Sequence, residues 1–223
     1  MADRRLSVHM VQHMLLLLIV PLLLLGGRPI ILLLRALPPT QRRRLVDVLQ
    51  RTRALTHPLV CLAFFYAVLL LTHLPGFYDA TLRHPALHDL EHVLYVLAGV
   101  VMWWPLLGVD PVPAHRLGGL ARLSYAIATM PPMALIGAWL DRQVTIVYGA
   151  YAAPARSLHI SALTDQANAG ATMWVAGNTV MAAAGLCVAV SALVAEERRL
   201  AGRERAQSAA GGGELPGQRS AAI

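Results

Sequence analysis

The chain has 223 residues, of which 57% are hydrophobic, 14% charged and 6% aromatic. This aliphatic content excludes an ordinary soluble domain and predicts an integral membrane protein. The net charge of +7 comes from 19 basic residues, all of them arginine. Because these arginines gather in particular loops rather than along a helix with interleaved aromatic residues, the positive-inside rule explains them better than nucleic-acid binding does.

Several apolar runs of about 20 residues are long enough to cross a hydrocarbon core of roughly 30 Å as helices. They predict an all-α polytopic membrane bundle of about five transmembrane helices, near residues 7–26, 54–74, 88–108, 121–141 and 170–194. With the N-terminus outside and the C-terminus in the cytoplasm, 14 of the 19 arginines lie in the cytoplasmic loops and tail. We expect one transmembrane domain over residues 1–195 and a disordered cytoplasmic tail over 196–223, where charged residues give way to Ala, Gly and Ser.

The loop after the first span predicts a cytoplasmic amphipathic helix. Pro38-Pro39-Thr40 begins a segment with arginines on one face and Leu45, Val46 and Leu49 on the other. An arginine-rich helix of this kind is typical of a segment that lies on anionic membrane lipid.

Seven of the nine histidines fall on the outer side in this arrangement. They are His9 and His13 at the start of the first span, His73 at the end of the second, His84, His88 and His92 at the start of the third, and His159 before the last. Imidazole is the commonest side-chain metal ligand, and residues four apart on a helix point the same way. The spacing therefore predicts a metal site at the outer membrane face.

The other candidate ligands indicate which metal this site would hold. Thioethers from Met10, Met14 or Met173 favour Cu(I), a soft ion, and Asp165 and Glu91 are candidates to orient the imidazoles through hydrogen bonds. Cys61 and Cys187 form no CxxC motif, so a redox dithiol is not expected. A simpler interpretation stays open for each group: His9 and His13 as headgroup residues, His73 as a helix cap, His84 as a surface residue and His159 as uninvolved.

The last two spans add two further expectations. Met130-Pro131-Pro132-Met133 predicts a break in the fourth span, with carbonyls that need donors from neighbouring helices; its methionines are either core fillers or part of a copper relay. Thr164-Asp165-Gln166 predicts the start of the fifth span, with Gln166, Gly170, Met173 and Gly177 on one face.

Several motifs together resemble the CtaG family of assembly factors for caa3-type cytochrome c oxidase. They are His9-Met10-Val11-Gln12-His13-Met14, His73-Leu74-Pro75-Gly76-Phe77-Tyr78, His84-Pro85-Ala86-Leu87-His88-Asp89-Leu90-Glu91-His92, Trp103-Trp104-Pro105, and Asp165-Gln166 followed by Gly170 and Met173-Trp174. The resemblance covers about residues 7–195. It implies a protein of the bacterial plasma membrane that matures a haem-copper oxidase, with the oxidase subunits as partners. Members usually carry further spans before the first histidine motif, so a longer gene product is expected.

From the residues and the resemblance we expect an assembly factor, not an enzyme, that binds and transfers copper at an extracytoplasmic His/Met site. The expected metal-binding residues are His9, His13, His73, His84, His88, His92, Met10, Met173 and Asp165. The alternatives are a b-type membrane oxidoreductase whose histidines clamp haem, and a scaffold that only docks oxidase subunits. The sequence leaves a homo-oligomer open.

Overall fold

The computed structural model describes residues 5–108, 117–152 and 159–211. Over these residues the chain forms helices without any strand, which confirms the all-α prediction. Four helical stretches are long and apolar enough to cross a membrane: Leu6–Ala36, Pro85–Leu107, Gly119–Asp141 and Ala162–Ser208. A fifth span results if the bent pair Pro58–Thr72 and Pro75–Arg83 crosses as one unit.

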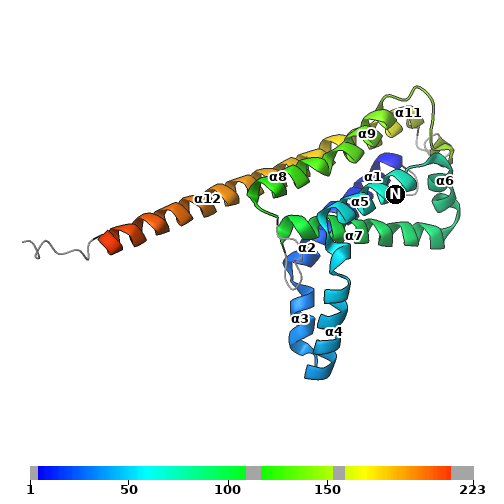
Figure 1. The fold of residues 1–223 in the computed structure, drawn as a ribbon. Helices are drawn as coiled ribbons and strands as arrows, with labels where there is room; N and C mark the ends of the chain where they lie inside the picture. The colour runs from blue at the N-terminus through cyan, green and yellow to red at the C-terminus, as the bar shows by residue number, and fades with distance from the viewer. Residues whose placement is uncertain (1–4, 109–116, 153–158, 212–223) are drawn as a thin grey trace, which may run out of the picture.

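The spans pack into one bundle (Figure 1). The first span comprises α1 (Leu6–Met14), the π-helical η2 (Leu15–Ile19) and α2 (Val20–Gly26), and its later part packs on α7 (Pro85–Leu107), as does α5 (Pro58–Thr72). The other half pairs α8 (Gly119–Ala128) with α12 (Gly177–Gly211), and α9 (Met130–Asp141) with α11 (Ala162–Ala171) and the π-helical η5 (Thr172–Ala176). Contacts of α1 with α11 join the two halves.

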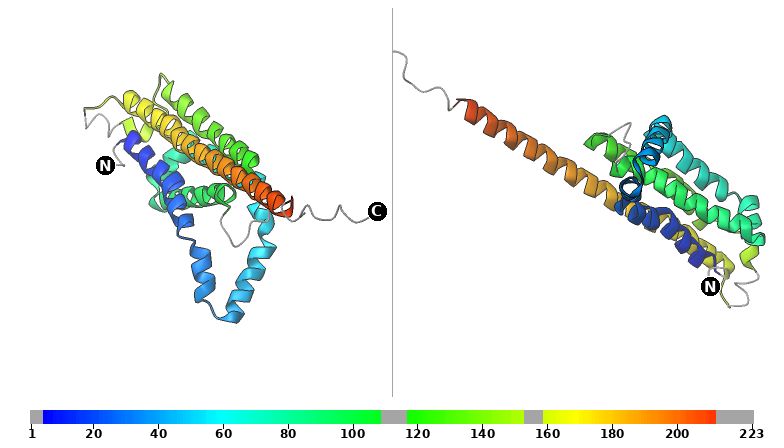
Figure 2. Two further views of the ribbon diagram at one scale, coloured as in Figure 1. Left: turned by 90° about the vertical axis from the view of Figure 1, so that its left-hand side faces the viewer. Right: turned by 90° about the horizontal axis from the view of Figure 1, so that it is seen from below.

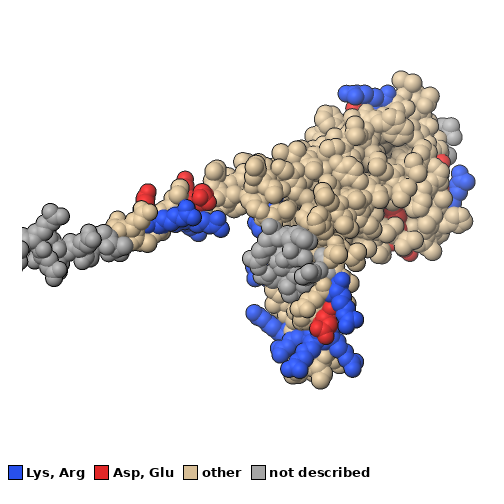
Figure 3. Space-filling view, viewed as in Figure 1, with Lys and Arg blue, Asp and Glu red and all other residues tan. Residues whose placement is uncertain are grey.

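A hairpin of α3 (Pro29–Ala36) and α4 (Pro39–Arg51) projects sideways from the bundle, and η3 (Arg53–Thr56) leads back from it (Figures 1 and 2). In α4, Leu45, Val46 and Leu49 are half-buried, whereas the arginines are exposed. Arginines gather on this hairpin and on the far part of α12, whereas the surface of the bundle is largely uncharged (Figure 3). The amphipathic helix expected after the first span is therefore present.

The second expected span is shorter and more bent than predicted. Its helix α5 ends at Thr72, and the chain turns by 72° into α6 (Pro75–Arg83). Leu74 between them has an extended backbone, because the ring of a following proline disfavours the helical conformation. The bend brings α6 across the end of the bundle that holds the first turns of α1 and α7 (Figure 1).

The start of the last span differs from the prediction. The helix begins at Ala162, and Ser161 is its cap, since its side chain accepts a hydrogen bond from the Thr164 amide at 3.3 Å; the cap expected at Thr164-Asp165-Gln166 is wrong. At the other end α12 runs on to Gly211, so residues 196–211 of the expected disordered tail are helical, and those up to Ser208 are exposed apart from the half-buried Ala201. Alanine, glutamate and arginine favour helix, which accounts for this extension; residues 212–223 lie outside the described chain.

Proline breaks the fourth span as expected. Helices α8 and α9 are separated at Thr129, and Pro132 cannot donate to the carbonyl of Ala128. The Tyr66 hydroxyl of α5 donates to that carbonyl instead, at 2.7 Å. A neighbouring helix thus supplies the hydrogen bond that proline removes.

Replacement of Tyr66 by phenylalanine is expected to lower the free energy of unfolding by roughly 1–3 kcal/mol, because a partly buried carbonyl is left without its donor. Thermal unfolding of the purified protein in detergent measures this loss. An unchanged midpoint would mean that the Ala128 carbonyl finds another donor.

Two close helix contacts depend on glycine. A Cβ atom on Gly99 of α7 would collide with the Leu17 carbonyl and lie 2.5 Å from Cγ of Pro21. A Cβ atom on Gly170 of α11 would lie 2.5 Å from the carbonyl oxygen of Gly137 in α9. Both contacts bring backbone against backbone, as small residues allow in membrane bundles.

Candidate metal centre

The first turns of α1 and α7 each present two imidazoles to the same space. His9 and His13 lie four residues apart on α1, and His88 and His92 do so on α7. His9 and His13 are completely buried, whereas His88 and His92 are half-buried. The i, i+4 spacing thus places each pair on one helix face, as predicted.

One nitrogen from each of these four side chains lies within 4.8 Å of the other three. The ring centroids of His9 and His13 are 4.1 Å apart, those of His88 and His92 4.2 Å, and those of His9 and His88 5.1 Å. Two nitrogens bound to one ion at about 2.1 Å each lie at most about 4 Å apart. Shifts of less than about an ångström would therefore suffice for the four to share an ion. We call these four residues the histidine cluster.

The imidazole nitrogens of the cluster lack protein partners. Both nitrogens of His9 and of His13, and Nε2 of His88 and of His92, make no hydrogen bond within the described chain. Buried polar groups in folded proteins are almost always paired, so this concentration of unpaired imidazole nitrogens makes the cluster a candidate ligand site. Neutral imidazoles suit copper, zinc, iron and nickel, and the residues present therefore fit such a metal.

Buried tyrosines, to which the sequence analysis assigned no role, surround the cluster. The Tyr78 ring of α6 lies 5.8 Å from that of His9, and the Tyr95 ring of α7 lies 4.5 Å from that of His13. The Tyr95 hydroxyl donates to Thr72 at 2.8 Å and lies 3.3 Å from Oε1 of Glu91. From sequence, the only indication of a tyrosine near the histidines was that Tyr95 lies one turn after Glu91. The bend between α5 and α6, which places Tyr78 there, had no sequence signal.

His73 lies beside the cluster but outside it. It is buried, its Nδ1 lies 2.8 Å from the Leu69 carbonyl, and its ring is 6.2 Å from Tyr78. Tyr148 donates to the His73 carbonyl at 3.0 Å. Burial and the nearby carboxyl groups of Glu91 and Asp79 raise the pKa of Tyr148 above its usual range, so this donor stays protonated.

His84 and His159 are exposed and do not belong to the cluster. Asp165 does not belong to it either, although it was expected as a ligand. Its Oδ2 accepts from the Leu6 amide at 2.6 Å, its Oδ1 from the Ser7 hydroxyl, and Arg5 lies 3.5 Å away. Asp165 therefore holds the start of α1 from α11, favoured by the positive end of the helix dipole.

Neither carboxylate orients the imidazoles as expected. Asp165 bonds to α1, the Glu91 carboxylate lies against Tyr95, and no hydrogen bond in the described parts of the chain joins either group to the cluster. The expected thioether ligands Met10 and Met173 are both completely buried in the adjoining core.

Asp165→Asn is expected to lower the free energy of unfolding by roughly 1–3 kcal/mol, since the variant loses charge-assisted bonds to a buried helix start. Asp47→Asn, which changes an exposed carboxylate on α4, is the matched control. Thermal unfolding in detergent compares the two variants. Equal midpoints would contradict the anchoring role of Asp165.

A pocket of about 350 Å³ leads to one side of the cluster. It is lined by Thr81, Leu82, Pro85, His88, Ala150 and Tyr151. His88 thus faces both the pocket and the buried imidazoles, and an ion entering there would meet this side chain first.

Comparison with known proteins adds the family context. Residues 1–194 match the family described as cytochrome c oxidase caa3 assembly factor (CtaG). An uncharacterized protein of Mycobacterium leprae is 31% identical over 129 residues, which cover 56% of this chain and 19% of that protein. An uncharacterized protein of Mycobacterium bovis is 29% identical over 158 residues, 69% of this chain and 23% of that protein. The chain spans about a fifth of the length of these relatives. No solved structure matches it.

Proposed function

The chain belongs to the family of cytochrome c oxidase caa3 assembly factors, and we propose that it supports oxidase assembly by holding copper at the histidine cluster and passing it on. The observation that carries this proposal is the convergence of four imidazoles, one nitrogen of each within 4.8 Å of the others, with no protein partner for these nitrogens in the described chain. In this role copper is cargo.

The arrangement suits transient binding. His9 and His13 are fully buried, while His88 lines the pocket. An ion would be captured at His88 and His92 and then held by all four side chains. The cluster contains no carboxylate or thiolate, so its ligands are neutral. Release of copper therefore does not require an ion pair to be broken. Transfer requires no change of oxidation state.

The cluster would sit near the extracytoplasmic face. The first turns of α1 and α7, which carry the cluster, lie at the end of the bundle away from the arginine-rich α3–α4 hairpin (Figure 1). Arginine-rich segments favour the cytoplasmic side, where anionic lipid attracts them. The N-terminus would then be outside and the C-terminus inside, with the oxidase subunits as partners at the outer face.

The packing of the cluster counts against the haem alternative. A haem with two axial histidines needs a gap that separates opposed imidazoles by a porphyrin plane. Here the two imidazole rings of each helix lie in contact, with centroids 4.1 Å apart on α1 and 4.2 Å apart on α7. The Tyr95 ring packs directly against that of His13. The comparisons point to assembly rather than to an oxidoreductase.

A complementation experiment tests the proposed function. The full gene product is expressed with His88→Ala and His92→Ala in a strain that lacks the gene, and the copper content and oxygen consumption of the isolated oxidase are measured. The variant should yield oxidase that contains haem but is depleted of copper, whereas His84→Ala, which changes an exposed histidine outside the cluster, should restore both. Full restoration by the double variant would contradict a copper role and favour a scaffold.

A further inference from the structure

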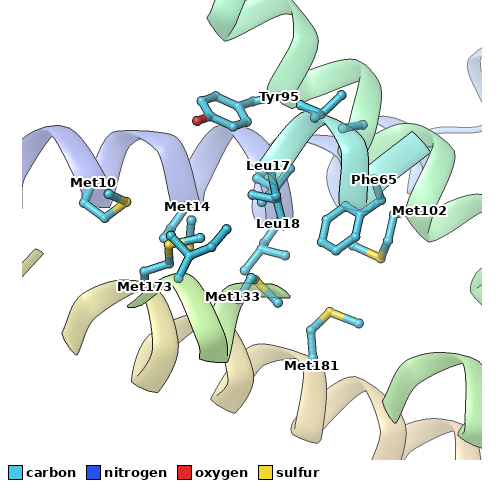
Figure 4. Packing of buried hydrophobic residues seen from close by; sticks show 14 of the residues in the cluster. Met10, Met14, Leu17, Leu18, Phe65, Tyr95, Met102, Met133, Met173 and Met181 are labelled. Atoms are coloured by element: carbon cyan, nitrogen blue, oxygen red, sulfur yellow. The ribbon is translucent and has the colours of Figure 1, made fainter. Parts of the chain in front are cut away.

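The core beside the histidine cluster is rich in methionine. Six buried side chains of this type lie in it: Met10, Met14, Met102, Met133, Met173 and Met181. Figure 4 shows Met10, Met14, Met173 and Met133 following one another through the interior, contributed by several helices. Methionine commonly fills irregular gaps in cores, so clustering alone does not establish a site.

Close backbone packing brings three of these sulfur-bearing side chains together. The contact between Gly137 and Gly170 holds α9 tightly against α11. Met133 lies one turn before Gly137, and Met173 lies one turn after Gly170. Met173 belongs to η5, which packs on α9, and both side chains are completely buried. Figure 4 shows them in the same part of the interior.

Gly177, one turn after Met173, completes the arrangement. A Cβ atom at this position would lie 3.0 Å from Sδ of Met133 and 3.5 Å from Sδ of Met14. The sulfur atoms of Met133 and Met14 thus both lie against Gly177, where α12 has no side chain. Met14 belongs to α1, the helix that carries His9 and His13. Met173 lies in η5, which packs on α1 as well as on α9, so buried thioethers from three chain segments lie in the same part of the core (Figure 4).

We propose that Met14, Met133 and Met173 form a second metal site, made only of thioethers, for a soft monovalent cation of the Cu(I) type. This inference rests on the proposed function and names the next position of the ion after the histidine cluster. Neutral thioethers select Cu(I) over harder divalent ions, and a single positive charge costs less to bury than two. Met14 lies on the same helix as His9 and His13, and an exchange of imidazole for thioether ligands leaves Cu(I) in the same oxidation state.

Silver(I), which mimics Cu(I) without oxidation, is a suitable probe. Equilibrium dialysis of the purified full chain compares the wild type with Met14→Leu/Met133→Leu/Met173→Leu. Leucine keeps the side-chain volume nearly constant and removes the sulfur. The triple variant should bind about one equivalent less Ag(I), while Met102→Leu/Met181→Leu, which changes two other buried methionines, should bind as the wild type does. Equal binding by all three proteins would overturn the proposal.

A measurement on the wild type covers the case in which the triple variant fails to fold. With methionine methyl groups labelled with carbon-13, Ag(I) titration should shift the resonances of Met14, Met133 and Met173, and unshifted resonances would overturn the thioether site. The same titration of His9→Ala/His13→Ala separates the two proposals. Methyl shifts that persist in this variant would support a thioether site that binds without the cluster. Methyl shifts in a wild type whose imidazoles bind no copper would support the thioether site and refute only the proposed function.

Discussion

Replacement of His9 and His13 by alanine is expected to lower the affinity for Cu(I) at least about 100-fold. Loss of a residue that merely orients a metal ligand costs about 10–100-fold in affinity, and this variant removes two ligands outright. Competition with a chromophoric Cu(I) chelator in detergent measures the affinity. The matched control is His84→Ala, because His84 is exposed and outside the cluster.

Copper-dependent stability provides a second readout of the same variant. Free copper at 100 times its dissociation constant stabilises a folded protein by about 2.7 kcal/mol when it does not bind the unfolded chain. The wild type and His84→Ala should therefore unfold at a higher temperature with copper, whereas the rise should be smaller in His9→Ala/His13→Ala, which keeps only the proposed thioether site. The same shift in all three proteins would place the copper elsewhere.

Gly170→Ala is expected to lower the free energy of unfolding by roughly 3 kcal/mol, because overpacking of a tight contact costs about 1–3 kcal/mol and occasionally more. The new Cβ would meet backbone atoms, the Gly137 oxygen at 2.5 Å and the Asp141 amide nitrogen at 2.6 Å. Backbone held in a helix cannot move aside as the end of a side chain can. Helices α9 and α11 would have to separate.

Gly185→Ala on α12 is the control for this substitution. Its Cβ would lie 3.6 Å from Cδ1 of Leu123 and 3.7 Å from Cβ of Ala126, which are ordinary contacts. Alanine also favours helix over glycine by about 1 kcal/mol, so this variant should be at least as stable as the wild type. Unfolding by titration with denaturing detergent compares them. Equal stability of Gly170→Ala and Gly185→Ala would show that the α9–α11 contact can relax.

Sequence alone could predict the pairing of histidines within each helix. Side chains four residues apart share a helix face by local geometry, so His9 with His13 and His88 with His92 followed directly. That α1 and α7 bring the two pairs together was an expectation based on their common end of the bundle. The structure adds the reason for their proximity: the first span packs on α7 where Gly99 admits the Leu17 carbonyl.

The roles of Asp165 and His84 depend on tertiary contacts and could not be predicted in this way. Asp165 lies at the expected level of the bundle, but α1 begins beside it and its oxygens bond to the Leu6 amide and the Ser7 hydroxyl. His84 is in helical register with His88 and His92, yet it precedes the helix and has an extended backbone. The periodicity of α7 therefore does not apply to its side chain.

The position of Tyr78 beside the cluster had no sequence signal. It results from the 72° bend between α5 and α6. A hydropathy pattern gives the length of an apolar segment but not the angle at which the chain continues after it. The break at Pro131-Pro132 was predictable because the missing amide follows from proline itself. Its partner Tyr66 was not, because that contact joins residues 62 positions apart.

X-ray absorption spectroscopy of the full chain loaded with one equivalent of copper tests the central claim most directly. The account predicts that the first ion is surrounded by imidazole nitrogens, and that this imidazole scattering is lost in His9→Ala/His13→Ala and retained in His84→Ala. A wild-type spectrum without imidazole scattering, or one unchanged in His9→Ala/His13→Ala, would contradict it.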